Sequence, residues 1–115
     1  MALYLVRQSR GPAYDPGRGR RAQDGWREHA AFMDALAERG AVLLGGPVGD
    51  DVDGGDALVV VSAADEAGAR STLSPDPWLG TVLTIKSVER WSVWLASPVG
   101  VEPEPATTPN DEAPS

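Results

Sequence analysis

The chain has 115 residues, a net charge of −7 and no cysteine. The lack of cysteine excludes disulfides, thiolate catalysis and cysteine metal sites, and the acidic balance argues against nucleic acid or an anionic membrane as a partner. Because there is one histidine, a zinc site would need carboxylates for nearly all its ligands, so we expect no metal site. The apolar run at the N-terminus is too short for a signal peptide or a membrane span, so we expect a cytoplasmic protein.

The hydrophobic pattern predicts strands and helices in the order β-α-β-β-α-β. Strands are expected over 2–8, 41–48, 57–63 and 81–95, and a short helix over 64–73. The longer first helix should lie between Asp24 as N-cap and Gly40 as C-terminal glycine. Simple alternation in the last strand would place Val82, Thr84, Lys86, Val88 and Arg90 on one face and Leu83, Ile85, Ser87 and Glu89 on the other.

This order of elements is typical of a ferredoxin-like α+β fold, an antiparallel four-stranded sheet with two helices on one face. The helices can cover only that face, so apolar residues such as Trp91 or Trp94 are expected on the other. A homodimer that packs sheet against sheet, forming a dimeric α/β barrel, would bury them. The alternative is that these aromatic side chains cover the edges of a monomer.

The end of the chain differs from the rest in composition. Residues 97–115 contain many prolines and acids and few large apolar side chains. We therefore expect a folded domain over residues 1–96 and a disordered acidic tail over 97–115.

Two loops contain charged motifs that could suggest ligands. The acidic stretch DDVDGGD, residues 50–56, lacks the carboxylate spacing of a calcium loop and has Ser62 where the closing Glu would stand, which favours a solvated hairpin turn. The stretch GRGRR, residues 17–21, could meet a phosphate or a carboxylate substrate. Its isolation in an acidic body favours an ordinary solvated loop.

The single histidine, His29, lies among apolar residues of the first predicted helix. It is either a core residue bonded to a backbone carbonyl or a group kept for chemistry. Asp76 is a candidate partner because two flanking prolines stiffen its backbone and Trp78 can exclude water beside it. An Asp that accepts a hydrogen bond from one imidazole nitrogen fixes the tautomer and makes the other nitrogen more basic. The alternative for Asp76 is a turn or a helix cap.

His29, Gly40 and Gly46-Pro47, followed by Asp76-Pro77 and an aromatic residue, resemble the pattern of the YCII (YciI-like) family. The similarity covers residue 2 to about residue 95. One branch of the family also has a Gly-Pro-aromatic-Asp-Pro loop after the first strand, matched here by Gly11, Pro12, Tyr14, Asp15 and Pro16. The chain departs from the family in having Trp78 where Tyr or Phe is usual, and Ser9-Arg10 where some relatives have an acid.

The resemblance implies a dimeric α/β barrel with His29 and Asp76 as an active-site dyad. Relatives similar to muconolactone isomerases and dehydrohalogenases suggest a cofactor-independent lyase or isomerase that takes a proton from a small organic acid or lactone. In this hypothesis His29 is the base, Asp76 orients it, Arg7 holds an anionic substrate, and Trp26, Pro47 and Trp78 form pocket walls. A non-catalytic dimeric module that binds a small ligand or a protein is the main alternative, and a cofactor-free monooxygenase is a weaker one.

Overall fold

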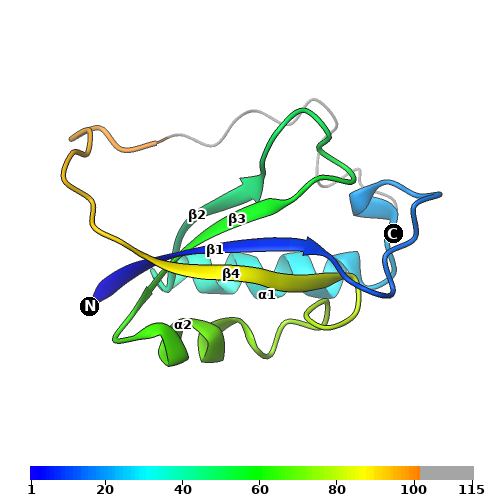
Figure 1. The fold of residues 1–115 in the computed structure, drawn as a ribbon, viewed down its shortest axis with the longest axis horizontal. Coiled ribbons are helices and arrows are strands. Elements are labelled where there is room, and N and C mark those ends of the chain that lie inside the picture. The colour runs from blue at the N-terminus through cyan, green and yellow to red at the C-terminus, as the bar shows by residue number, and fades with distance from the viewer. Residues whose placement is uncertain (102–115) are drawn as a thin grey trace.

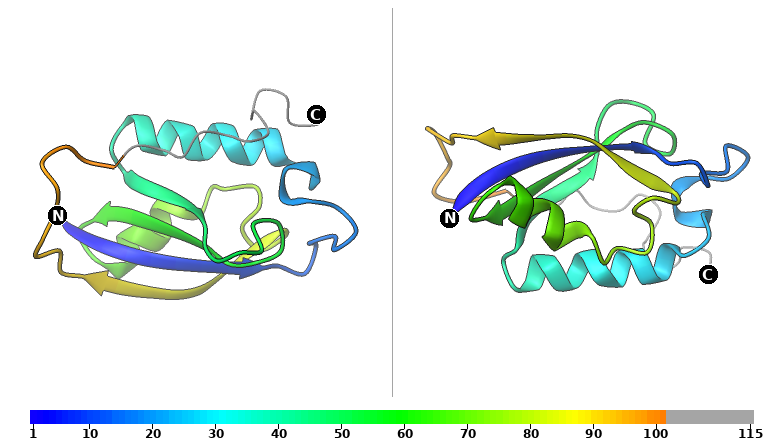
Figure 2. Two further views of the ribbon diagram at one scale, coloured as in Figure 1. Left: turned by 90° about the horizontal axis from the view of Figure 1, so that it is seen from above. Right: turned by 60° about the horizontal axis from the view of Figure 1, so that its bottom comes forward.

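The structure is a computed structural model, and it describes residues 1–101. Within them, the chain forms one antiparallel sheet of four strands with α1 and α2 on the same side of it (Figures 1 and 2). The elements are β1 (Ala2–Arg10), a 3-10 turn η1 (Arg20–Ala22), α1 (Trp26–Glu38), β2 (Val42–Pro47), β3 (Ala57–Ala63), α2 (Glu66–Leu73) and β4 (Leu83–Trp91). The predicted ferredoxin-like α+β fold is confirmed. No helix among these residues is long and apolar enough to cross a membrane.

The sheet has the strand order β2-β3-β1-β4, so β1 and β3 are the central strands. Successive residues of β1 point to opposite faces. Tyr4, Val6 and Gln8 are buried beneath the helices, and Arg7, between Val6 and Gln8, lies on the open face. The run ALVVVSA of β3 has only two residues that are not buried, as expected for a central strand.

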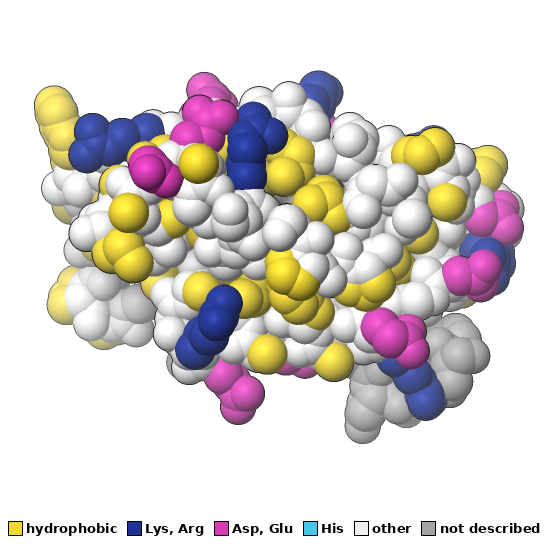
Figure 3. Space-filling view, turned by 90° about the horizontal axis from the view of Figure 1, so that it is seen from below, with side chains coloured by type: hydrophobic (Ala, Val, Ile, Leu, Met, Phe, Trp, Pro, Cys, Tyr) yellow, Lys and Arg dark blue, Asp and Glu magenta, His cyan; other side chains and the backbone are white. Residues whose placement is uncertain are grey.

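The space between sheet and helices holds two apolar clusters. The main cluster joins the sheet to both helices and contains Tyr4, Val6, Leu36, Val42, Val59, Val61, Ala63, Ala69 and Leu73, with Phe32, Met33, Ile85 and Val88 packed against it. The tryptophan cluster contains Trp78, Val82 and Leu83, with Tyr14 and Trp26 packed against it. Figure 3 shows that hydrophobic side chains form a band across the middle of the helix-covered side, and no histidine surface is visible there.

The last strand is shorter than the pattern predicts and its faces change partway. It ends at Trp91 because that residue pairs with Leu3, close to the first residue of β1. The pairs Arg7 with Ser87 and Gln8 with Ile85 leave Lys86 as the extra residue of a bulge. The bulge puts Val88 on the helix-covered face with Ile85, so the alternation expected from the sequence is wrong beyond Lys86.

The start of α1 also differs from expectation. The N-cap is Gly25, with φ +80°, and no side chain caps the helix. A Cβ on Gly25 would also lie 3.2 Å from the indole nitrogen of Trp78, so glycine is favoured here by both its backbone conformation and its lack of a side chain. Asp24 is therefore displaced from the capping position, and its carboxylate pairs with Arg18 instead, with Arg18 Nη1 3.1 Å from Oδ1.

The open face of the sheet carries a row of apolar residues beside the charged Arg7 and Glu89. Trp91 pairs directly with Leu3 on that face and is 47% exposed, as predicted. Trp94 lies beyond β4 and is 94% exposed. The same face carries Leu3, Leu5, Leu44, Leu58 and Val60. The predicted tail boundary at residue 97 falls near the end of the described part, and residues 102–115 lie outside it.

Candidate functional site

His29 and Asp76 are in direct contact. The imidazole Nδ1 lies 2.8 Å from Oδ2 and 2.9 Å from Oδ1 of the carboxylate. The carboxylate side chain has no exposed surface, and 13% of the imidazole is exposed. These are the two residues predicted from the sequence to pair, although 47 positions separate them. His29 lies on α1 and Asp76 on the loop after α2.

The loop holds Asp76 in a fixed position. Its backbone N–H donates to the Leu73 carbonyl at the end of α2, and its Oδ1 accepts the backbone N–H of Trp78 at 2.9 Å. Pro75 and Pro77 restrict the backbone on either side. The carboxylate is thus aimed before any ligand binds, which is the arrangement that a positioned acid–base group requires.

Three aromatic rings form the centre of the site, and two of them flank the imidazole. His29 stacks on Trp78 with ring centroids 4.1 Å apart and an angle of 8° between the planes. Trp26 lies against both rings, at 5.9 Å from His29 and 5.6 Å from Trp78. Trp78 is 1% exposed, and its indole N–H donates to the Asp24 carbonyl at 2.7 Å, which satisfies the polar end of a buried tryptophan.

The geometry defines the state of the imidazole. A carboxylate can only accept hydrogen bonds, so Nδ1 of His29 carries the proton and the neutral ring leaves Nε2 with its lone pair free. Among residues 1–101, Nε2 has no hydrogen-bond partner. His29 also lines a groove of about 420 Å³ along α1, together with Trp26, Arg27, Ala30, Ala31, Met33 and Asp34. The arrangement can accept a proton from a molecule in that groove.

The other residues proposed from the sequence divide into two groups. Trp26 and Trp78 lie at the dyad, as expected for pocket walls. Arg7 is on the open face of the sheet, where its Nη1 lies 3.1 Å from Asp56 Oδ2, and the pKa of Asp56 is lowered by that hydrogen bond and by the charge of Lys86. Pro47 ends the edge strand β2, is exposed, and does not line the groove. Within one subunit, neither Arg7 nor Pro47 reaches the dyad.

The loop between β1 and α1, which supports Trp78, could not be recognised as part of the site from the sequence. Gln23 is 3% exposed. Its amide oxygen accepts the backbone N–H of Asp15, and its NH₂ donates to the carbonyls of Asp15 and Arg18. These bonds fix the shape of the loop up to Asp24. The Asp24 carbonyl in turn accepts the indole N–H of Trp78. The lining residues at positions 27, 30, 31 and 34 follow the helical spacing of α1, which is the signal that could have identified them.

Within GRGRR, Gly17 and Arg18 are exposed, but Arg20 departs from the expected solvated loop. Its side chain donates to the carbonyls of Val52 at 2.9 Å and Gly55 at 2.8 Å, and its backbone N–H donates to Asp53. Burial lowers the pKa of Arg20. These bonds fasten the loop after β1 to the loop between β2 and β3, a contact between distant segments that local patterns do not reveal.

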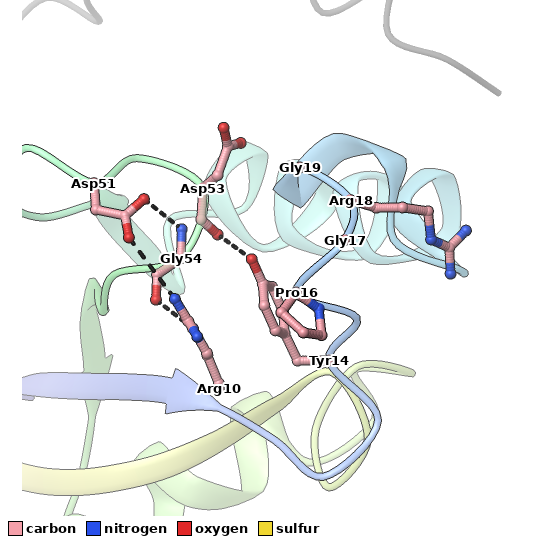
Figure 4. Close-up of a pocket in the computed structure, with 9 residues that line it drawn as sticks. All are labelled: Arg10, Tyr14, Pro16, Gly17, Arg18, Gly19, Asp51, Asp53 and Gly54. Atoms are coloured by element: carbon pink, nitrogen blue, oxygen red, sulfur yellow. Dashed lines mark hydrogen bonds and ion pairs between the residues drawn. The ribbon is translucent and has the colours of Figure 1, made fainter.

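A second, polar hollow of about 290 Å³ lies where these two loops meet (Figure 4). Arg10 donates to the Gly54 carbonyl and stacks over Tyr14, whose hydroxyl donates to the Asp53 carbonyl. Arg18 is paired with Asp15 and Asp24. The hydrogen-bonding groups of this hollow bind one another, and we assign it no ligand. Among residues 1–101, no group of three or more His, Cys, Asp or Glu side chains could hold a metal ion.

Of the comparisons with known proteins, the one with solved structures found a similar fold. No family model matches the chain, and no curated protein sequence matches it. Among solved structures, the chain is similar to the 5-chloro-2-hydroxyhydroquinone dehydrochlorinase TftG of Burkholderia phenoliruptrix AC1100, in complex with 2,5-dihydroxybenzoquinone. The identity is 22%, the TM-score is 0.55, and the match covers 78% of this chain and 93% of the dehydrochlorinase. At this identity the likeness shows the shared fold.

Proposed function

We propose that the protein is a cofactor-independent lyase or isomerase that acts on a small organic acid, lactone or hydroxylated ring. One observation carries the proposal: a buried carboxylate holds His29 through Nδ1, so that Nε2 is left free on a residue that lines a groove. A neutral imidazole held in this way is a competent general base.

The reaction class follows from what the site offers. Elimination of HCl, or the shift of a double bond in a lactone, needs a base to take a proton and a place for the displaced electron pair. In dehydrochlorination the pair expels chloride, so proton and chloride leave together and no oxidant is consumed. Nε2 takes the proton, and Asp76 stabilises the imidazolium that results. The dehydrochlorinase activity of the structural neighbour is in keeping with this class.

The aromatic wall suggests the shape of the substrate. Trp26 lines the groove next to His29, and Ala30 and Ala31 leave room beside it. A flat ring could pack against the indole with its acidic hydroxyl or C–H near Nε2. This favours an unsaturated ring or lactone over a branched aliphatic acid.

Activity assays with matched variants would test the proposal. We expect the protein to release chloride from 5-chloro-2-hydroxyhydroquinone, or to isomerise a member of a lactone panel. His29→Gln should lose at least about 100-fold in rate, the usual scale of a general base. Arg70→Ala, which removes an exposed pair with Glu66 on α2, is the control and should keep full activity. Full activity in His29→Gln would refute the proposal.

The alternative function is a non-catalytic dimeric module that binds a small ligand or a protein. The small exposed fraction of the imidazole, 13%, and its stacking on Trp78 favour it, because both also suit a structural histidine. Binding of panel compounds by calorimetry, without turnover of any of them, would favour this alternative.

We also propose that the functional unit is a homodimer joined through the open faces of two sheets. The support is the apolar side chains of that face: Trp91 and Leu44 are about half exposed, and Leu3 and Leu5 are partly exposed. A monomer rarely leaves such a surface in contact with water.

A further inference from the structure

One buried donor in the described part of the chain has no partner. Gln8 is 2% exposed, and its amide Nε2 is the single buried side-chain N or O atom of residues 1–101 that makes no hydrogen bond with the protein. A buried donor without a partner costs about 1–3 kcal/mol. Leu or Met would fill the same space at no such cost, so the polar group calls for an explanation.

Gln8 lies on a strand that joins the same two apolar clusters as the two segments of the dyad. On β1, Gln8 lies between Val6 of the main cluster and Arg10, which pairs with Leu83 of the tryptophan cluster. On α1, His29 lies between Trp26, packed on the tryptophan cluster, and Met33, packed on the main cluster. On the third segment, Asp76 lies between Leu73 of the main cluster and Trp78 of the tryptophan cluster. Each of the three segments thus contributes one polar residue at the boundary between the two clusters.

We call Gln8, His29 and Asp76 the polar seam. The buried polar or charged side chains of residues 1–101 are Gln8, Gln23 and Asp76. Gln23 already uses its amide on the loop after β1. Asp76 is therefore the buried side chain left with acceptor capacity: Oδ1 accepts from Trp78 and His29, whereas Oδ2 accepts from His29 alone.

We infer that Gln8 is a third member of the site, a positioning residue whose Nε2 donates to the Asp76 carboxylate through one buried water. A buried water needs two to four polar partners, and the polar seam supplies a donor and an ionised acceptor. The added donor would hold the Asp76 carboxylate in place as the acceptor of the Nδ1–H of His29, so that the Nε2 of His29 stays free. The inference deepens the proposed function, because it adds a residue to the same site.

Gln8→Met and the control Arg70→Ala test the inference. In Gln8→Met the water-bridged bond to Asp76 is lost and apolar contact is gained in its place, so we expect the melting temperature to change little. The ring ¹⁵N and ¹H signals of His29, the single histidine, should nevertheless move. In Arg70→Ala an exposed pair with Glu66 on α2 is lost, so both the melting temperature and the His29 signals should stay in place.

A double-variant cycle gives a second, independent readout. If Gln8 acts through Asp76, the changes in stability of Gln8→Met and Asp76→Asn should not add in the double variant. Unmoved His29 signals in Gln8→Met together with additive stabilities would overturn the inference. If Gln8→Met folds poorly, Gln8→Leu provides the same two readouts. Neither readout depends on turnover. The inference about Gln8 can therefore fail while the proposed function stands, and the proposed function can fail while the inference stands.

Discussion

The contact between His29 and Asp76 couples the stability of the protein to its proposed function at one pair of residues. Asp76 has no exposed side-chain surface, and its side-chain partner is the imidazole. Partial exposure leaves the imidazole accessible from the groove, whereas the carboxylate is accessible only through it. Any change to one residue therefore alters the environment of the other.

Removing the imidazole should destabilise the protein through Asp76. In His29→Leu the buried carboxylate keeps the backbone N–H of Trp78 and loses its side-chain partner. We expect a loss of about 1–3 kcal/mol, the cost of leaving a buried hydrogen-bonding group without its partner. The double variant His29→Leu/Asp76→Leu should recover much of this loss, because no buried charge is left. Urea unfolding of the three proteins measures both values, and an unaffected single variant would contradict the buried pair.

Asp76→Asn should reverse the tautomer of His29. The Trp78 N–H donates to Oδ1, so the new side-chain amide would keep its oxygen there and place its NH₂ at the position of Oδ2, 2.8 Å from Nδ1. An NH₂ group donates, so Nδ1 must become the acceptor and the proton must move to Nε2. The base is then lost although the packing remains. Long-range ¹H–¹⁵N spectra of the ring distinguish the tautomers, and an unchanged Nδ1–H form would show that the carboxylate does not fix the ring.

Asp56 gives the structure a small acid-sensitive contribution. Its folded-state pKa is lowered by Arg7 and Lys86, so the contribution is present above the unfolded value of about 3.9 and is lost as the pH falls through the lower folded value. Because the pair is partly exposed, Asp56→Asn should cost at most about 0.5–1 kcal/mol at pH 7. The difference from wild type should vanish near pH ~2. Urea unfolding at both pH values tests this, and a gap that persists in acid would be inconsistent with the ion pair.

At the scale of elements, the periodic parts of the sequence were predictable and the contacts between distant segments were not. The central strand β3 and the helix α1 follow from apolar runs and helical spacing, and the Asp76-Pro77 turn carries its own signal. The bulge at Lys86 could not be foreseen, because it depends on how β4 pairs with β1. The Gly25 cap was missed for a similar reason, since Trp78 from another part of the chain lies against it.

The loop after β1 should depend on Arg20. Arg20→Met leaves the carbonyls of Val52 and Gly55 without their donor, so we expect a loss of about 1–3 kcal/mol. The amides of residues 14–24 should also exchange faster with solvent, because this loop loses its attachment to the β2–β3 loop. Arg18→Met is the control, since its ion pairs are exposed and its loss should change stability little. Equal effects of the two variants would argue against the proposed role of Arg20.

At the scale of the whole molecule, the two faces of the sheet differ. Helices bury one face, and the main cluster lies beneath them. The other face presents Leu3, Leu5 and Trp91, and the chain continues past β4 with Trp94 and Leu95, which are 94% and 92% exposed. A stable interface between proteins buries about 1,200–2,000 Å² in total, which one face of a four-stranded sheet can supply together with its partner.

The proposed dimer should fail when charge is placed at the centre of the open face. Leu5 lies between Val60 and Glu89, so a lysine there can pair with Glu89 in a monomer, whereas in the dimer its charge would be buried against the facing sheet. Light scattering should give twice the chain mass of 12.1 kDa for wild type and the single chain mass for Leu5→Lys. Val52→Lys is the matched control, because Val52 is 58% exposed in the β2–β3 loop and off the sheet, so its dimer should persist. If wild type is a monomer at micromolar concentration, the open face has another role, and because the His29–Asp76 contact lies within one subunit, the tests of the dyad would still apply.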